Sequence, residues 1–220
     1  MKKSILIFLI SSFALKINSQ TANPTVDFSE NGGSYYSNIN QKGQIFINPY
    51  FGFPNTLSGG IDVNNGLTFP IKSNETIDNI GPLGLNLSFM VSDDVSAGLD
   101  VNYSKCSKTF EYIGYDSLNT ETFNGSRTII RAMVSVNYHM HINDRLEGYL
   151  AIGAGYRDPE NNFSSTDSNY VDLSPINENN FAFRLSGGLN IFINKQIGIN
   201  TEFGFGGGGL IRIGLFYKLI

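Results

Sequence analysis

The sequence contains no Trp, one Cys and few charged residues, which make up 15% of its 220 positions. The single Cys, Cys106, excludes an internal disulfide framework. The charged share lies well below the about 25% that is usual for soluble globular domains. With 24 Gly, 11 Tyr and 17 Phe, the composition favours short strands and turns over helices. The length allows one domain of ordinary size.

The chain has only one long apolar run, and this run is at the N-terminus. Met1, Lys2 and Lys3 form a small basic region, and residues 4–15 are apolar and uncharged. The run is too short to span a bilayer and polar sequence follows it, so residues 1–19 are expected to be a secretory signal peptide cleaved after Ser19. The alternative is a buried N-terminal strand or helix. Residues 20–42 are expected to form a flexible periplasmic lead-in.

A net positive charge is also missing. The whole chain carries a formal charge of −4, and without Lys2, Lys3 and Lys16 it keeps twelve basic and 19 acidic residues, a charge of −7. A nucleic-acid partner would require a basic stripe, so this class of partner is excluded.

Strict alternation of apolar and polar residues replaces any helical period in residues 43–220. In 211–219, for example, Ile211, Ile213, Leu215, Tyr217 and Leu219 share one face, opposite Arg212, Gly214, Phe216 and Lys218. The same alternation occurs in 83–91, 95–104, 130–142, 146–156, 181–193 and 197–205, and more weakly in 43–53, where Pro49 removes a ladder donor. These segments have about the length that a tilted strand needs to cross a membrane.

The connections between these segments are alternately tight and long. Residues 92–94, 143–145 and 194–195 are tight turns, whereas 54–80, 105–126 and 157–180 are long and polar. The fourth long-side connection, 206–209, consists of glycine alone, and it is a turn rather than a phosphate loop. This alternation is typical of membrane barrels with short periplasmic turns and long external loops. We therefore predict an all-β fold: a closed, antiparallel, up-and-down transmembrane barrel of eight strands.

The two faces of the strands favour a barrel in a membrane over a soluble barrel. The polar face carries mainly Gly, Ser, Asn and Ala, which suit the narrow inside of eight strands. The other face is rich in Leu, Ile, Val and Phe, and it would aggregate in water. Closure is expected because a sheet edge cannot be left unpaired in hydrocarbon.

Isolated charges on the polar face are expected to pair inside the barrel. Buried charges persist only when they are paired and hydrogen-bonded, and these charges alternate in sign from strand to strand. A network that plugs the lumen is favoured over a gated ion path, because eight strands leave little room for water. The residues are Asp100, Arg131, Glu147, Arg184, Glu202 and Arg212.

Aromatic residues of the apolar face are expected to form two girdles at the membrane interfaces. The girdle near the long connections comprises Tyr103, Tyr156, Phe181, Phe203 and Phe205, and that near the tight turns comprises Tyr138 and Tyr217.

The last strand carries the most specific motif. Arg212, Gly214, Tyr217 and Leu219 match, in order, the pattern polar-x-Gly-x-x-aromatic-x-hydrophobic, although the chain ends in Leu219 and Ile220 rather than in Phe. In this respect residues 43–220 resemble the OmpA/OmpX-type eight-stranded outer-membrane barrels, in the variety common in Bacteroidetes. The resemblance implies recognition by the barrel-assembly machinery, insertion into the outer-membrane bilayer as a monomer, and periplasmic N- and C-termini.

No residues indicate an enzyme, a cofactor or a metal site. His139 and His141 share one face of a strand and could hold a metal, but no Cys or carboxylate cluster is near them in the sequence, so polar lining of the lumen is favoured. The long connections contain no His, which argues against a His-dependent hydrolase. We expect a structural or surface-interaction barrel that binds an unidentified partner through its long connections, with a narrow channel for small solutes as the alternative.

Overall fold

The computed structural model describes residues 40–55, 71–113, 119–166 and 179–219, which all belong to one compact unit, Tyr36–Ile220. The expected signal peptide and most of the expected lead-in lie outside these residues. No helix that is long and apolar enough to span a bilayer occurs in the described part of the chain.

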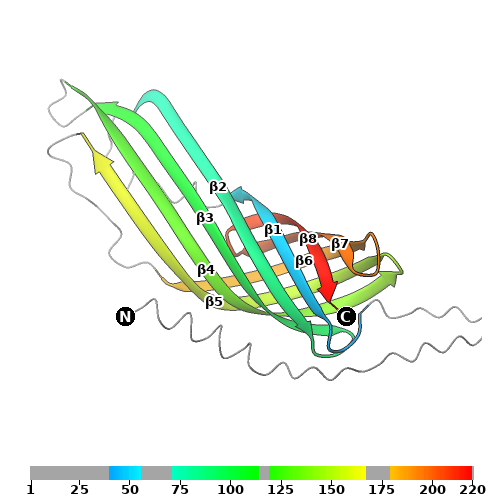
Figure 1. Cartoon of the computed structure of the whole chain (residues 1–220). Coiled ribbons are helices and arrows are strands. Elements are labelled where there is room, and N and C mark those ends of the chain that lie inside the picture. The colour runs from blue at the N-terminus through cyan, green and yellow to red at the C-terminus, as the bar shows by residue number, and fades with distance from the viewer. Residues whose placement is uncertain (1–39, 56–70, 114–118, 167–178, 220) are drawn as a thin grey trace, which may run out of the picture. The chain divides into compact units, whose positions relative to one another are not determined.

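Eight antiparallel strands close into a barrel in sequence order (Figure 1). They are β1 (Ile45–Asn55), β2 (Ile71–Met90), β3 (Val95–Ile113), β4 (Thr120–Asn143), β5 (Leu146–Ser165), β6 (Phe181–Phe192), β7 (Ile197–Gly206) and β8 (Gly209–Leu219). Closure comes from β1, which pairs with both β2 and β8. The predicted fold class, a closed eight-stranded up-and-down barrel, is therefore correct.

Pro49 interrupts the closing pair of strands without opening the barrel. The ladder between β1 and β8 runs from Ile45↔Leu219 to Ile47↔Tyr217 and resumes at Tyr50↔Gly214. The gap falls at Asn48 and Pro49, as expected for a residue that has no N–H to donate. On its other side Pro49 stays in register with Leu85 of β2.

The alternation of the sequence becomes an inside and an outside. Along β8, the side chains of Arg212, Phe216 and Lys218 are buried, whereas those of Ile213, Leu215 and Tyr217 are exposed. The exposed set includes Val134, Ile152 and Leu215, each about 60% or more accessible. The barrel thus carries its apolar side chains on the outside and its polar ones within.

Glycines on the inner face make room for large rings on the neighbouring strand. Gly84 lies opposite Tyr50, and Gly188 lies opposite Tyr149. A Cβ at Gly188 would lie 2.3 Å from the Tyr149 ring, and one at Gly84 would lie 2.2 Å from the Tyr50 ring. These cross-strand pairs let two tyrosines fill the narrow lumen.

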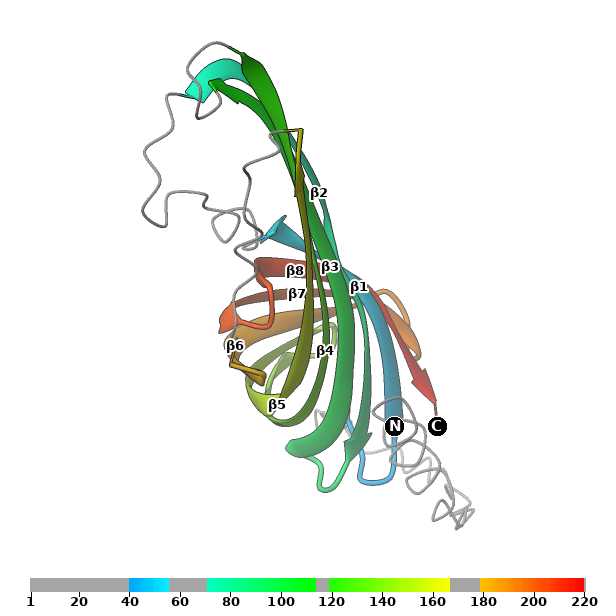
Figure 2. The same cartoon turned by 90° about the vertical axis from the view of Figure 1, so that its left-hand side faces the viewer.

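Four strands continue beyond the closed ring. The β5–β6 ladder ends at Tyr156↔Phe181, and the β1–β2 ladder ends at Phe51↔Leu83, but β2, β3, β4 and β5 remain paired as far as Ile71↔Tyr112 and Phe123↔Ser165. Figures 1 and 2 show these strands projecting past β1, β6, β7 and β8. We call this four-stranded part the extension. Most residues of the extension belong to the connections 54–80, 105–126 and 157–180, which the sequence pattern predicts to be loops. For the residues of the extension this prediction is wrong.

Candidate functional site: the lumen, its mouth and the extension

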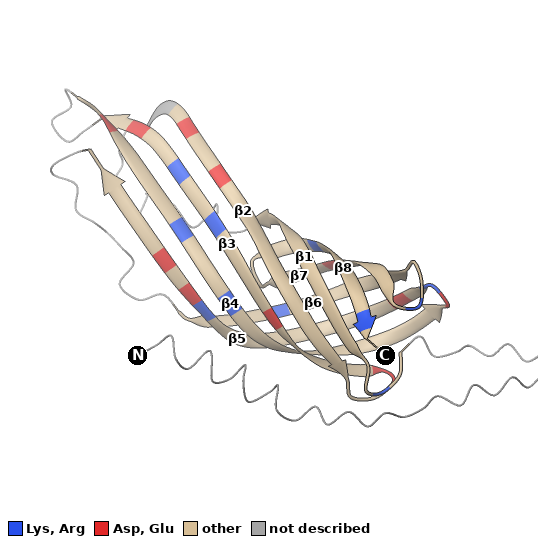
Figure 3. Ribbon diagram, in the orientation of Figure 1, with Lys and Arg blue, Asp and Glu red and all other residues tan. Residues whose placement is uncertain are grey.

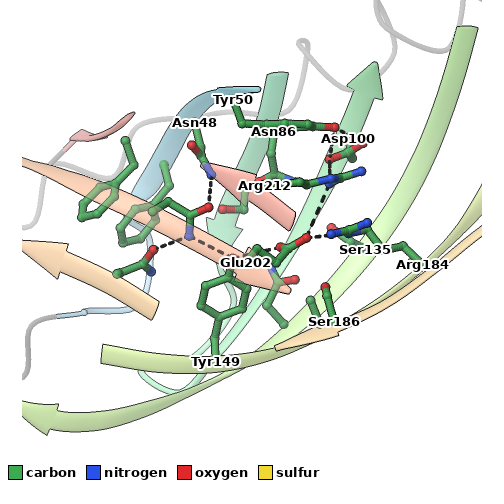
Figure 4. Close-up of a pocket in the computed structure, with 18 of the residues that line it drawn as sticks. Asn48, Tyr50, Asn86, Asp100, Ser135, Tyr149, Arg184, Ser186, Glu202 and Arg212 are labelled. Carbon is green, nitrogen blue, oxygen red and sulfur yellow. Dashed lines mark hydrogen bonds and ion pairs between the residues drawn. The ribbon is translucent and has the colours of Figure 1, made fainter. Parts of the chain in front are cut away.

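Four of the six expected lumen charges form one ion-paired cluster (Figure 4). Arg212 Nη1 donates to Asp100 Oδ2 at 2.8 Å and lies 3.7 Å from Glu202 Oε1. Arg184 Nε donates to the same Glu202 oxygen. Tyr50 donates its hydroxyl to Asp100 at 2.9 Å. Each carboxylate in the middle of the lumen therefore has a guanidinium partner, which offsets the cost of removing both charges from water.

Glu147 lies further toward the tight turns and has a different partner. It contacts His139 Nδ1, and the other ring nitrogen of His139 lies 2.9 Å from Ser96 Oγ. The amide of Asn40, from the expected lead-in, also donates to Glu147, so this end of the lead-in is buried in the lumen. His141 is exposed, and it is the direct cross-strand partner of Glu147.

Three uncharged side chains join the two groups of charges into one chain of hydrogen bonds. Tyr149 donates its hydroxyl to Glu202 Oε2, and Asn200 donates to the Tyr149 oxygen, both at 2.9 Å. Asn200 also donates to Asn190 Oδ1 at 2.7 Å, and Asn190 donates to Glu147 Oε1 at 2.9 Å. Sequence reasoning missed Tyr149, Asn190 and Asn200 as connecting residues, although their place on the polar face could have indicated them.

Arg131 is linked to this network only through the side chain of Asn102, whose amide donates to Asp100 Oδ1 at 3.0 Å. Its Nη1 donates to Asn102 Oδ1 at 3.2 Å and to Ser104 Oγ at 3.1 Å, and no carboxylate of the described residues lies within ion-pair distance. All six expected residues are thus linked by hydrogen bonds and ion pairs, but the direct partners of Arg131, which is buried at the mouth of the lumen, are polar and uncharged.

An apolar cluster closes the lumen at the tight-turn end. Phe46, Met90, Phe192 and Phe216 are buried together there, and the Phe192 and Phe216 rings meet edge to face with their centroids 4.9 Å apart. We call these four residues the apolar plug. The sequence pattern predicts Phe216 on the polar face, but the prediction did not include that an aromatic ring at this position would occlude the lumen.

The glycine turn 206–209 closes the opposite end of the same lumen. Arg184 Nη1 donates to the carbonyls of Gly206 and Gly209, and Arg212 Nη2 donates to that of Gly207. Gly206, Gly207 and Gly208 have positive φ angles, which only glycine adopts without strain. Between the turn and the apolar plug lies a polar cavity of about 60 Å³, which includes the unpaired hydroxyls of Ser135 and Ser186. Such a cavity has room for a few water molecules.

Polarity inverts where the strands leave the closed ring. The same face of β3 that carries Asp100 and Asn102 inside the barrel carries Phe110 and Tyr112 in the extension. With Cys106, Phe123 and Ile129 these rings form a buried apolar cluster. The opposite, outward face of the extension is polar and surrounds a shallow hollow. The residues that border the hollow are Ser107, Thr109, Asn124, Gly125, Ser126, Asn162, Ser164 and Phe163, and the ring of Phe163 packs against the inner apolar cluster. Figure 3 shows charged residues on the strands of the extension and around the tight turns.

The expected girdle residues all lie on the outer face of the ring. Tyr103, Tyr138, Tyr156, Phe181, Phe203, Phe205 and Tyr217 are between 37% and 59% exposed. Of the expected assembly motif, Arg212 and Gly214 point into the lumen, and Tyr217 and Leu219 point outward. No group of three His, Cys, Asp or Glu side chains that could hold a metal occurs in the described ranges.

Comparison with known proteins gives structural likeness without sequence relatives. No family model matches the chain, and no curated protein matches it. The outer membrane protein OprG of Pseudomonas aeruginosa aligns with 82% of this chain and 97% of its own at a TM-score of 0.49 and 11% identity. A de novo designed transmembrane β-barrel covers 81% of this chain and 98% of its own, with a TM-score of 0.39 and 14% identity. Ail of Yersinia pestis, in complex with the heparin analogue sucrose octasulfate, covers 81% and 100%, with a TM-score of 0.35 and 12% identity. The Bacteroidetes variety stays a prediction.

Proposed function

We propose that this chain is an integral outer-membrane barrel with a structural or surface-interaction role, and that its extension is the part that meets partners outside the cell. The inversion of polarity along β3, β4 and β5 carries the proposal. The outward side chains are apolar from the tight turns up to Tyr103, Ile130 and Tyr156, and polar beyond them. An apolar outer face requires lipid, whereas a polar outer face requires water, so the boundary between the two marks a membrane surface.

The height of the apolar band fits a bilayer. On β4 the band runs from Ile130 to Ile142, both about half exposed. At about 3.4 Å per residue and a tilt of about 40°, this stretch rises about 30 Å, close to the thickness of the hydrocarbon core. The tight turns then lie on the periplasmic side, together with both ends of the barrel sequence. The aromatic residues named above become the girdles.

Assembly and oligomeric state follow the same proposal. Arg212, Gly214, Tyr217 and Leu219 would be recognised by the barrel-assembly machinery before β8 pairs with β1. The barrel is proposed to be a monomer, because its whole outer face is needed for lipid.

Location and orientation can be tested in one experiment. The membrane-extracted protein should migrate faster on gels before heating than after it, as expected for a folded barrel. Protease added to intact cells should cleave in the connections of the extension and leave the tight turn at Asp144 uncut. Cleavage at Asp144 in intact cells would overturn the orientation, and recovery of the protein from the soluble fraction without detergent would overturn the membrane assignment.

A narrow channel is the second candidate, because the middle of the lumen contains a polar cavity. The apolar plug and the ion-paired cluster argue against conduction by the unaltered protein. In planar bilayers the wild type should give no defined openings, whereas the double variant Arg212→Ala/Phe216→Ala should conduct. It loses one ring of the apolar plug and the arginine that both pairs with Asp100 and donates to Gly207 of the glycine turn. Defined openings in the wild type that change in size with Arg212→Ala alone would favour the channel.

A further inference from the structure

Two arginines lie opposite each other where the closed ring ends. Arg131 of β4 and Arg157 of β5 are direct cross-strand partners, one residue beyond the last β5–β6 pair, Tyr156↔Phe181. Their position in the alternation places both side chains on the inner face. Arg131 is only 5% exposed, and Arg157 is half-buried. Like charges directly opposite each other on one face of a sheet repel and destabilise the pair of strands.

Neither arginine has a counter-charge among the residues that the structure describes. Arg131 donates through Nη1 to Asn102 and Ser104, and its Nε and Nη2 donate to no described residue. Arg157 donates through Nε to the carbonyl oxygen of Asn179 at 2.7 Å. Arg184 and Arg212, deeper in the same lumen, are both compensated by carboxylates. A buried guanidinium without a negative partner is unfavourable, so this pair differs from the rest of the lumen.

The acidic residues nearest in sequence point away from the pair. Asp158 and Glu160 alternate with Arg157 on β5, so they are on the outward face and are exposed. On the inner side, Arg131 lies beside the glycine turn. A Cβ at Gly208 would lie 2.6 Å from Arg131 Nη1 and 3.3 Å from Ser104 Oγ. The guanidinium group of Arg131 therefore fills the place that a side chain at position 208 would take, and it packs directly against the glycine turn.

We propose that Arg131 and Arg157, with the hydroxyl of Ser104, form a binding site for a phosphate or sulfate group at the long-connection mouth of the lumen. An anion between the two guanidinium groups would turn their repulsion into two charge-assisted hydrogen-bonded contacts. The planar fork of each guanidinium suits the oxygens of a tetrahedral anion. The group belongs either to a free anion or to the headgroup of a lipid or saccharide that reaches the mouth.

The decisive variant is Arg157→Gln, because Arg157 is half-buried and its removal relieves repulsion. The refolded mature chain in detergent is unfolded by heat in chloride and in increasing inorganic phosphate or sulfate at matched ionic strength. The wild type should show a saturable rise of the unfolding midpoint with anion concentration, as expected for a ligand of the folded state. Without the anion, Arg157→Gln should unfold at a higher temperature than the wild type, and its response to the anion should need at least tenfold more phosphate.

Arg145→Gln provides the matched control, because Arg145 is an exposed arginine in the tight turn at the other end of the barrel. Arg145→Gln should show the same rise of the unfolding midpoint with anion concentration as the wild type. The general stabilisation by sulfate acts on all variants alike, so it cancels when their midpoints are compared. Ser104→Ala should weaken the response without removing charge. A free anion and a lipid headgroup are distinguished by repeating the wild-type measurement in vesicles with and without a phosphomonoester lipid. If the lipid raises the unfolding midpoint and added free phosphate removes this effect, the site binds a headgroup. A lower midpoint of Arg157→Gln without the anion, or an unchanged response, would show that the pair is only structural and overturn the site.

Discussion

The close approach of Gly188 to Tyr149 allows a sharp test of how the lumen is filled. In Gly188→Ala the new Cβ would lie 2.3 Å from Tyr149 Cζ and 2.5 Å from its hydroxyl oxygen. The ring would have to move by about 1.2 Å to reach an ordinary contact of about 3.5 Å. Tyr149 is held in place by Glu202 and Asn200, both at 2.9 Å. The variant therefore either overpacks the lumen, at about 1–3 kcal/mol, or breaks a hydrogen bond to a charged group, at about 1.5–3 kcal/mol.

Gly187→Ala is the control on the same strand, one residue away and on the outer face. Its Cβ would make only an ordinary contact, 3.4 Å from a Leu150 methyl carbon. Loss of a flexible glycine should leave stability unchanged or raise it by up to about 1 kcal/mol. Urea unfolding in lipid vesicles should therefore separate the two variants by about 1–4 kcal/mol. When Tyr149→Ala is added to both variants, much of this difference should disappear. Equal stability of the two alanine variants, within about 0.5 kcal/mol, would refute the proposed packing of Tyr149 against Gly188.

Two further predictions concern the charges and the thiol. Glu202→Gln leaves two guanidinium groups with the single carboxylate of Asp100, so it should destabilise the barrel by about 3 kcal/mol or more. Glu75→Gln, which loses a half-exposed pair with Lys108, should cost less than about 1 kcal/mol in the same urea titration, and equal losses would contradict the argument. Burial raises the pKa of the Cys106 thiol, so maleimide should label it at least tenfold more slowly at pH 7.5 than a thiol introduced by Thr109→Cys on the outward face of a Cys106→Ser chain. Comparable labelling rates at that pH would show that the apolar cluster of the extension opens readily.

The sequence predicts the closed ring well because one physical constraint acts on every strand of it. Each outward position must be apolar and each inward position small or paired, so period-two alternation identifies strands, faces and turns together. Pro49 illustrates how specific this reasoning becomes: its missing N–H predicts a weak point in the ladder, and the β1–β8 ladder is interrupted there.

The extension was missed because the constraint reverses outside the ring. On β3, Lys105, Ser107 and Thr109 continue the outward face that Val101 and Tyr103 begin, and Phe110 and Tyr112 continue the inward face. When a strand is identified by one apolar face, its pattern ends where the two faces exchange polarity, and the residues beyond that point are assigned to a polar loop. Long polar connections that keep period-two alternation with exchanged faces are therefore better interpreted as strands that continue beyond the closed ring.

The partners inside the lumen could not be predicted because they depend on the register of strands that are far apart in the sequence. Asp100 and Arg212 are 112 residues apart, and they meet only because β1, which lies between β2 and β8, closes the barrel. Charge alternation indicates that partners exist but not which residues pair.

Arg131 shows what this distinction means for function. Five of the expected lumen residues are compensated by neighbours, so their charges need no ligand and their role is satisfied within the fold. Arg131 is as deeply buried as Arg212, but it faces a second arginine across the ladder instead of a carboxylate. Stability alone would favour a neutral residue at 157, because the removal of one like charge relieves repulsion without leaving an acid unpaired. A pair of guanidinium groups at the mouth, where solutes and headgroups can reach it, is instead the arrangement expected of a site that is completed by an anion from outside.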